Sequence, residues 1–159
     1  MAISTTQSVW RSGGGDTTKT AYAGSMMMVA DFTFNPTQTS GNALTGVGGF
    51  PIVLPIGAVV IFVATNGGAT GGTSPTIDMG FTLYQTGTAS PQALVNETPA
   101  DSKQFVNWSS ATAGASLGAV MSATEMVYLT GRAGASAATG GTITGRIEYY
   151  VPTNGQYTA

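Results

Sequence analysis

The sequence has no histidine and no cysteine, and only 8% of its 159 residues are charged. Without histidine, neither a Ser–His–Asp triad nor a Cys–His pair can form, and the usual proton carrier near neutral pH is missing. Ordinary zinc sites need Cys or His ligands, and disulfides need Cys, so both are excluded. We therefore expect a protein that is not an enzyme, with no catalytic residues, no cofactor and no bound metal.

Basic residues are also few, and long apolar runs are absent. The net charge is −2, and the five basic residues are scattered along the chain. Nucleic-acid binding depends on clustered Lys and Arg, so we expect no nucleic-acid partner. The most apolar stretch, residues 50–64, is shorter than the ~20 residues of a membrane helix and contains two prolines and a glycine. We therefore expect no membrane partner either.

The seven acidic residues are too sparse to indicate a catalytic pair. A glycosidase needs two carboxylates about 5–9 Å apart, and nothing in the spacing favours such a pair. Asp78 lies on the polar face of a predicted strand, where we expect it to make a cross-strand hydrogen bond. A calcium site is the alternative, but no Asp-x-Asp pattern accompanies it.

Small and hydroxylated residues make up most of the chain. Gly, Ala, Ser and Thr account for 82 of the 159 residues. They dominate residues 1–25, which we predict to be an extended N-terminal arm preceding a body at residues 26–159. Val9, Trp10 and Arg11 stand out in this polar segment. They could pack on their own body, but Trp and Arg are favoured at interface hot spots, so we predict an inter-subunit contact.

Three segments have the residue patterns of strands. Residues 26–34 alternate between apolar and polar positions, and residues 76–84 do the same, as in half-buried strands. Residues 58–65 are continuously apolar and β-branched, which indicates a central strand covered on both faces. We predict that the strands at 58–65 and 76–84 are adjacent and antiparallel. Residues 37–49 are predicted to be a polar loop.

The second half of the chain contains further short strands. Residues 104–108 predict a strand with Phe105, Val106 and Trp108 buried, and residues 126–130 predict another. Residues 142–151 alternate again, which places Tyr149 in the core and Tyr150 at the surface or at an interface. No segment has helical periodicity over ten residues. The sequence therefore predicts a single antiparallel all-β sandwich, similar to a jelly roll.

Residues 54–80, LPIGAVVIFVATNGGATGGTSPTIDMG, resemble a pattern of small virion proteins of tailed bacteriophages. In that pattern L-P-x-G-A-V-V leads a strand, and a glycine-rich loop and T-x-D-x-G follow. The resemblance extends loosely to residues 140–150, GGTITGRIEYY. It implies a head decoration (cement) protein or a related virion component, and it transfers no catalytic residues.

From these observations we expect a non-enzymatic decoration protein on the capsid exterior of a phage virion. Its expected partners are the major capsid protein and further copies of itself, as a homotrimer. Val9, Trp10, Arg11 and Tyr150 are the expected contact residues. The alternative is a tail-fibre, knob or head-fibre module that binds host-surface glycan, with exposed Tyr84, Tyr150 and Trp108 stacking on sugars. Low charge suits a protein that packs into a lattice.

Overall fold

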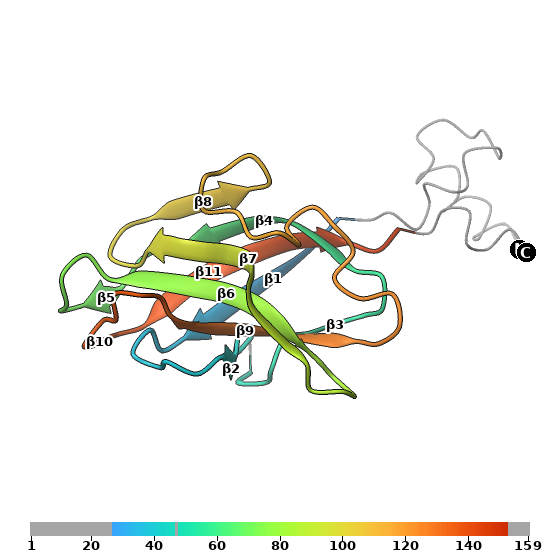
Figure 1. Ribbon diagram of the computed structural model, residues 1–159, viewed down its shortest axis with the longest axis horizontal. Coiled ribbons are helices and arrows are strands. Elements are labelled where there is room, and N and C mark those ends of the chain that lie inside the picture. The colour runs from blue at the N-terminus through green and yellow to red at the C-terminus, as the bar shows by residue number, and fades with distance from the viewer. Residues whose placement is uncertain (1–26, 47, 153–159) are drawn as a thin grey trace, which may run out of the picture.

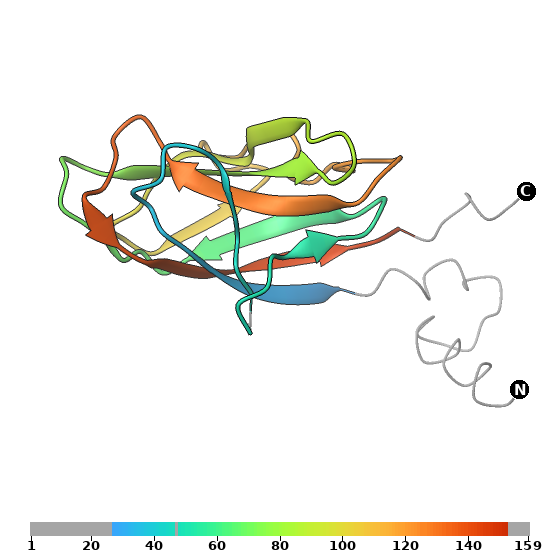
Figure 2. The same cartoon turned by 90° about the horizontal axis from the view of Figure 1, so that it is seen from below.

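The computed structural model describes residues 27–152 with the exception of residue 47. None of these residues is helical, and the strands form two facing layers (Figures 1 and 2). Sheet A has the order β1-β11-β4-β8, and sheet B has the order β2-β9-β6-β7 with β3 also paired to β9. The strands are β1 (Met28–Phe34), β2 (Asn42–Ala43), β3 (Val53–Leu54), β4 (Val59–Thr65), β5 (Ala69–Thr70), β6 (Thr76–Leu83), β7 (Ala89–Pro99), β8 (Gln104–Asn107), β9 (Val127–Ala133), β10 (Gly140–Gly141) and β11 (Ile143–Tyr150).

The pairing of the strands is that of a jelly roll. β1 pairs with β11, β2 and β3 pair with β9, β4 pairs with β8, and β6 pairs with β7, all antiparallel. Thus the first strand of the chain pairs with the last, and the following strands pair successively towards the middle of the chain, where β6 pairs with β7. This is the pattern of one long hairpin. Rolling that hairpin gives two packed sheets with Greek-key connections. The predicted all-β, jelly-roll-like sandwich is confirmed.

Alternating side chains of both sheets form the core. In β1, Phe32 and Phe34 are buried while Val29 and Asp31 are exposed, as the period-2 pattern predicts. In β11, Ile143 and Ile147 are buried, and Tyr149 packs against the same cluster. Leu, Ile, Val and Met side chains from the facing sheet complete the layer. Burial of this apolar area is the main stabilising contribution to the fold.

The prediction that residues 58–65 and 76–84 form neighbouring strands is wrong. β4 lies in sheet A between β11 and β8, and β6 lies in sheet B between β9 and β7. The connection between them crosses from one sheet to the other. It turns at Gly67 and Gly68, which have φ of 67° and 132°, and it continues through β5, which pairs with β10. Consecutive strands usually pair, but a jelly roll places these two in opposite layers.

Two further local predictions are also wrong. Residues 37–49 are not only a loop, because they contain β2 and the fully buried Leu44. Of the three residues expected to be buried at 104–108, only Val106 is buried, while Phe105 and Trp108 are 59% and 69% exposed. β8 is an edge strand with one face in the core, so alternation from Val106 points Phe105 to solvent. Trp108 follows the end of β8, in a turn.

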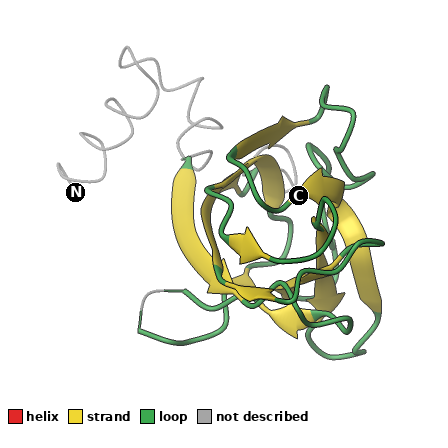
Figure 3. Ribbon diagram, turned by 90° about the vertical axis from the view of Figure 1, so that its left-hand side faces the viewer, coloured by secondary structure: helices red, strands yellow, loops and turns green. Residues whose placement is uncertain are grey.

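The two described ends of the chain lie together. Met28 at the start of β1 is the register partner of Tyr149 near the end of β11. Loops dominate the opposite end of the sandwich, which faces the viewer in Figure 3. The predicted arm, residues 1–25, lies outside the described residues, so its boundary with the body stays a prediction.

Gly145 in β11 allows close packing that no other residue would permit. Phe32 is its register partner on β1. A Cβ at position 145 would overlap the Ala64 carbonyl oxygen and lie 2.5 Å from the Phe32 ring. The Phe32 ring therefore occupies the space that a side chain at position 145 would fill.

We expect Gly145→Ala to lower the free energy of unfolding by about 1–3 kcal/mol, because the added methyl group overpacks a strand interior. Urea denaturation followed by circular dichroism measures this loss. The matched control is Gly41→Ala, where an added Cβ meets Thr130 at an ordinary 3.6 Å. Equal stability of the two variants would contradict the packing role of Gly145.

Candidate functional site: the outer face of sheet A

The outer face of sheet A, turned away from sheet B, carries two rows of side chains from its four strands. The register aligns Val29, Glu148, Phe62 and Asn107 in one row, and Asp31, Arg146, Ala64 and Phe105 in the next. The residues between them along each strand belong to the core. Side chains from segments far apart in the sequence therefore share one surface.

An aromatic stack lies at the β8 edge of this face. The rings of Phe62 and Phe105 are stacked, with centroids 6.0 Å apart and planes at 19°. The Lys103 ammonium nitrogen lies 5.2 Å from the centroid of the Phe105 ring. A cation over a ring is favourable by about 0.5–1 kcal/mol at an exposed site. This contact gives Phe105 and Lys103 a defined arrangement on the surface.

An ion pair lies at the β1 side of the same face. Arg146 Nε donates to Asp31 Oδ1 at 3.1 Å, and both side chains are more than half exposed. Exposed pairs of this kind contribute at most about 1 kcal/mol. The pair therefore occupies Asp31 and Arg146 without adding much to stability.

Between the stack and the ion pair the surface is hollowed, with a volume of about 320 Å³. A second hollow of about 360 Å³ adjoins it and shares Asp31, Asn66 and Gly145. The small residues Ala64 and Gly145 form part of the lining, so aromatic and charged side chains surround a shallow depression. The first hollow is lined by Asp31, Phe62, Ala64, Asn66, Lys103, Phe105, Gly145, Arg146 and Glu148.

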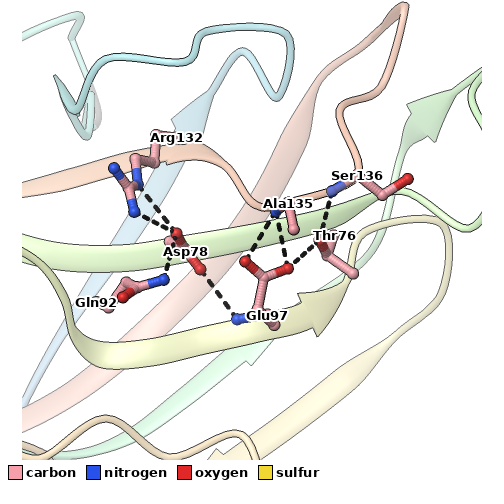
Figure 4. Close-up of polar contacts among 7 residues, drawn as sticks. All are labelled: Thr76, Asp78, Gln92, Glu97, Arg132, Ala135 and Ser136. Carbon is pink, nitrogen blue, oxygen red and sulfur yellow. Dashed lines mark hydrogen bonds and ion pairs between the residues drawn. The ribbon is translucent and has the colours of Figure 1, made fainter.

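Sheet B has a different outer face, because a buried carboxylate is held there (Figure 4). Asp78 on β6 is 1% exposed. Its Oδ2 accepts hydrogen bonds from Arg132 at 2.8 and 2.9 Å and from Gln92 at 3.0 Å. Its Oδ1 accepts one from the Glu97 backbone N–H at 3.0 Å. The expected cross-strand interaction is confirmed, since Arg132 is the register partner of Asp78 on β9.

Irregularities in β7 bring two of these donors to Asp78. The register pairs Ile77 with Thr98 and Met79 with Val95, so two β7 residues oppose Asp78 alone. One of them, Glu97, has a φ of 51°. A larger irregularity follows, with four residues between Val95 and Ser90, and it contains Gln92. Bulges of this kind redirect backbone groups at a sheet edge.

The Glu97 carboxylate is occupied in turn by neighbours. It accepts hydrogen bonds from the Ala135 backbone N–H at 2.8 and 2.9 Å and from the Thr76 hydroxyl at 2.5 Å. Each acid in this cluster thus binds groups of the protein itself. The arrangement links β6, β7 and β9 and fits a structural role.

We expect Asp78→Ala to lower the free energy of unfolding by about 2–4 kcal/mol, because it leaves the partly buried Arg132 without its counter-ion. Asp31→Ala is the matched control, since it removes the exposed pair and should cost less than about 1 kcal/mol. Chemical denaturation of both variants measures the difference. Similar losses would contradict the assigned role of the buried pair.

Glu125 is a second buried acid, at 5% exposure. Its carboxylate accepts hydrogen bonds from the Gln85 backbone N–H at 2.5 Å and from the backbone and hydroxyl of Thr86 at 3.1 and 3.0 Å. Desolvation raises the pKa of Glu125 and is the largest single effect. The three hydrogen bonds together outweigh it, so the pKa is lowered from its ordinary value of 4.5.

A lowered folded-state pKa gives a defined pH dependence. The stabilisation from the ionised Glu125 is fully present above the unfolded value near 4.5 and is lost as the pH falls through the folded pKa. We therefore expect wild-type protein to be more stable than Glu125→Gln at pH 6, with the difference shrinking towards pH 3. Urea denaturation across this range measures it. A difference that is independent of pH would contradict the role of the charge.

Among the described residues, no group of three or more acidic side chains is placed to hold a metal ion. In the same part of the chain, no helix is long and apolar enough to cross a membrane.

The predicted contact residues are only partly described. Val9, Trp10 and Arg11 lie outside the described residues, and their role stays a prediction. Tyr150 is half-buried in β11, opposite Val59. Tyr149 packs against the core, and alternation places Tyr150 on the other side of the sheet.

Sequence reasoning misses the part of the surface made by Phe62 and Phe105. Phe62 lies within a continuously apolar run, which predicts burial on both sides. Phe105 precedes the buried Val106, and strict alternation from Val106 places Phe105 outside. The sequence pattern therefore predicts the exposure of Phe105. For Phe62 no such pattern exists, because the residues on either side in the sequence are also apolar.

No family model matches the chain. A search of curated proteins found no match. Among solved structures, a chain described as "Cyanophage Pam1 capsid asymmetric unit" is similar, with a TM-score of 0.45 and 17% sequence identity over 81% of this chain and 87% of that chain. A likeness at this level says nothing about what this chain binds.

Proposed function

We propose that this protein is a structural component of a tailed-phage virion. More specifically, we propose a head decoration protein that lies on the capsid exterior as a homotrimer, binds the major capsid protein and catalyses no reaction. The observation that carries the proposal is the difference between the two outer sheet faces. Along β6, the centre of sheet B, the outer side is covered by neighbouring residues of the chain, whereas the outer face of sheet A exposes Val29 and Phe105.

The contrast is clear when the strands are compared. On β6, the central strand of sheet B, Asp78, Gly80 and Thr82 are all buried although they alternate with core residues. On the two edge strands of sheet A, Val29 and Phe105 are 55% and 59% exposed, compared with 41% for Val53 on β3 of sheet B. Exposed aromatic and aliphatic side chains that gather on one face are typical of protein–protein contact surfaces.

The composition of the surface supports the same function. Side chains of Gly, Ala, Ser and Thr lose little conformational entropy when they are ordered at an interface. A chain with 8% charged residues has few ions to desolvate when it packs against a neighbour. Both properties favour a protein that lies within a lattice of subunits.

The jelly roll is compatible with this function. Viral capsid proteins and lectins both use this architecture, and a fold by itself does not identify a function. The fold therefore supports the virion role by analogy, and the exposed face of sheet A is the specific argument for it.

Binding to capsids tests the proposal. We expect purified virions to contain about as many trimers as the capsid has threefold and quasi-threefold positions, as measured by quantitative mass spectrometry. Full-length protein added to capsids that lack it should fill exterior sites seen by cryo-electron microscopy. Phe105→Asp should weaken this binding about tenfold or more, because it replaces the exposed aromatic ring that stacks on Phe62 with a charge.

The matched control is Phe50→Asp, since Phe50 is 75% exposed and does not line the hollows of sheet A. Absence of the protein from virions would overturn the virion role altogether. A few copies per virion would contradict decoration and would place the protein in the neck or tail. Equal binding of the two variants would show that the outer face of sheet A does not contact the capsid.

A second candidate function is glycan binding, as a module of a tail fibre or head fibre. The observation that favours it is the exposure of Tyr84 and Trp108, at 57% and 69%, since exposed aromatic rings can stack on sugars. A glycan array probed with the full-length protein separates the two functions. Specific hits without capsid binding would favour the glycan-binding module.

A further inference from the structure

We propose that the hollow on the outer face of sheet A is the docking site for the Val9–Trp10–Arg11 segment of a second copy of this chain. This inference rests on the proposed function, in which copies of the chain associate. It adds the surface and the segment that join them. Four features of the molecule support it.

The first feature is a carboxylate without a partner beside the hollow. Arg146 is paired with Asp31, and Lys103 lies over the Phe105 ring. Glu148 lines the same hollow, yet its side chain makes no hydrogen bond or ion pair with another described residue. The hollow therefore has one acidic group free to bind a cation from outside.

The second feature is the apolar surroundings of that carboxylate. In the register of sheet A, Glu148 lies between Val29 on β1 and Phe62 on β4. Phe62 in turn stacks on Phe105. A fitting ligand therefore carries a cation directly next to apolar groups, with an aromatic ring favoured.

The third feature is that residues 9–11 have this chemistry. Arg11 is the only charged side chain among the first 15 residues, and it directly follows Val9 and Trp10. An arginine can bind a carboxylate through two parallel hydrogen bonds, and its planar group also stacks on aromatic rings. Trp and Arg are the residue types most enriched at interface hot spots.

The fourth feature is size and reach. The hollow of about 320 Å³ lies within the range of pockets that hold small ligands, about 300–1,000 Å³, so a short segment suits it. Residues 12–26 separate Arg11 from Met27, and 15 residues can span up to about 50 Å. From Met27 to the middle of sheet A is roughly 20 Å, given about 3.3 Å per residue and 4.8 Å between strands. A linker of this length can therefore extend well beyond sheet A of its own copy.

A charge exchange between two variants of the full-length chain tests the inference. Sedimentation velocity should show that wild-type protein self-associates, and that Arg11→Glu and Glu148→Arg each weaken association about tenfold or more. An equimolar mixture of the two variants should recover association, because the acid introduced in the segment of one copy then meets the base introduced in the hollow of another. Recovery in the mixture requires that the contact is between copies.

Controls keep the result specific. Lys19→Glu makes the same change of charge within the N-terminal segment and should associate as wild type does. Thermal unfolding should confirm that each variant is folded, and Glu148→Gln replaces Glu148→Arg for the single-variant comparison if the arginine variant is not.

Several outcomes would overturn the inference. They are a monomeric wild-type protein, single variants that associate normally, a mixture that does not recover, or a Lys19→Glu variant that is equally impaired. The last would indicate a general charge effect, and a failed mixture would place the segment on its own chain or on another surface. A monomeric wild-type protein would also contradict the proposed homotrimer. None of these outcomes changes the capsid occupancy of the wild-type protein, so failure here is distinguishable from failure of the virion role.

Discussion

The burial of one carboxylate, Asp78, constrains the whole of sheet B. A charged group at the centre of a sheet must have its hydrogen bonds satisfied, because leaving it unpaired would cost several kcal/mol. Arg132 supplies two of them directly across the strands. The others require β7 to leave regular pairing, with Glu97 in the left-handed region and Gln92 reaching back from a bulge. The irregular β7 is thus part of the structure that neutralises the charge. The same groups cover the outer side of β6, whereas the Phe62–Phe105 stack lies on the outer face of sheet A.

Regular strands can be predicted from the sequence, and their partners cannot. β1 and β11 have clear alternation, because each has one face in the core and one in solvent, and their limits agree with the predicted segments to within two residues. Pairing depends on contacts between distant parts of the chain. Nothing in the glycine-rich segment before β6 indicates that it crosses between sheets, so the local pattern favours pairing of β4 with β6. Leu44 is missed because a single buried residue among polar neighbours has no periodicity.

The candidate site is predictable only in its parts. Trp10 and Arg11 are noticeable because an aromatic ring and a cation are unusual in a segment of small residues. Phe62 and Phe105 meet only because β4 and β8 are neighbours, and that adjacency follows from the jelly roll topology. Glu148 has no distinguishing sequence signal, since its significance is the absence of a partner on the described surface. The composition indicates that the chain is suited to packing against other subunits. The position of the contact surface can be found only once the strand register of sheet A is known.

The pairing of the first strand with the last has a consequence for the connectivity of the chain. Because Met28 and Tyr149 are opposite one another, a short linker could join the two described ends without breaking any strand pair. New ends could be opened at the hairpin between β6 and β7, where Gly87 has open space around it. Circular permutation is tolerated at exposed loop tips of this kind. The permuted chain would keep both sheets and would have its termini in the β6–β7 loop. The start of β1 would then be joined to the end of β11 and would no longer follow an N-terminal segment.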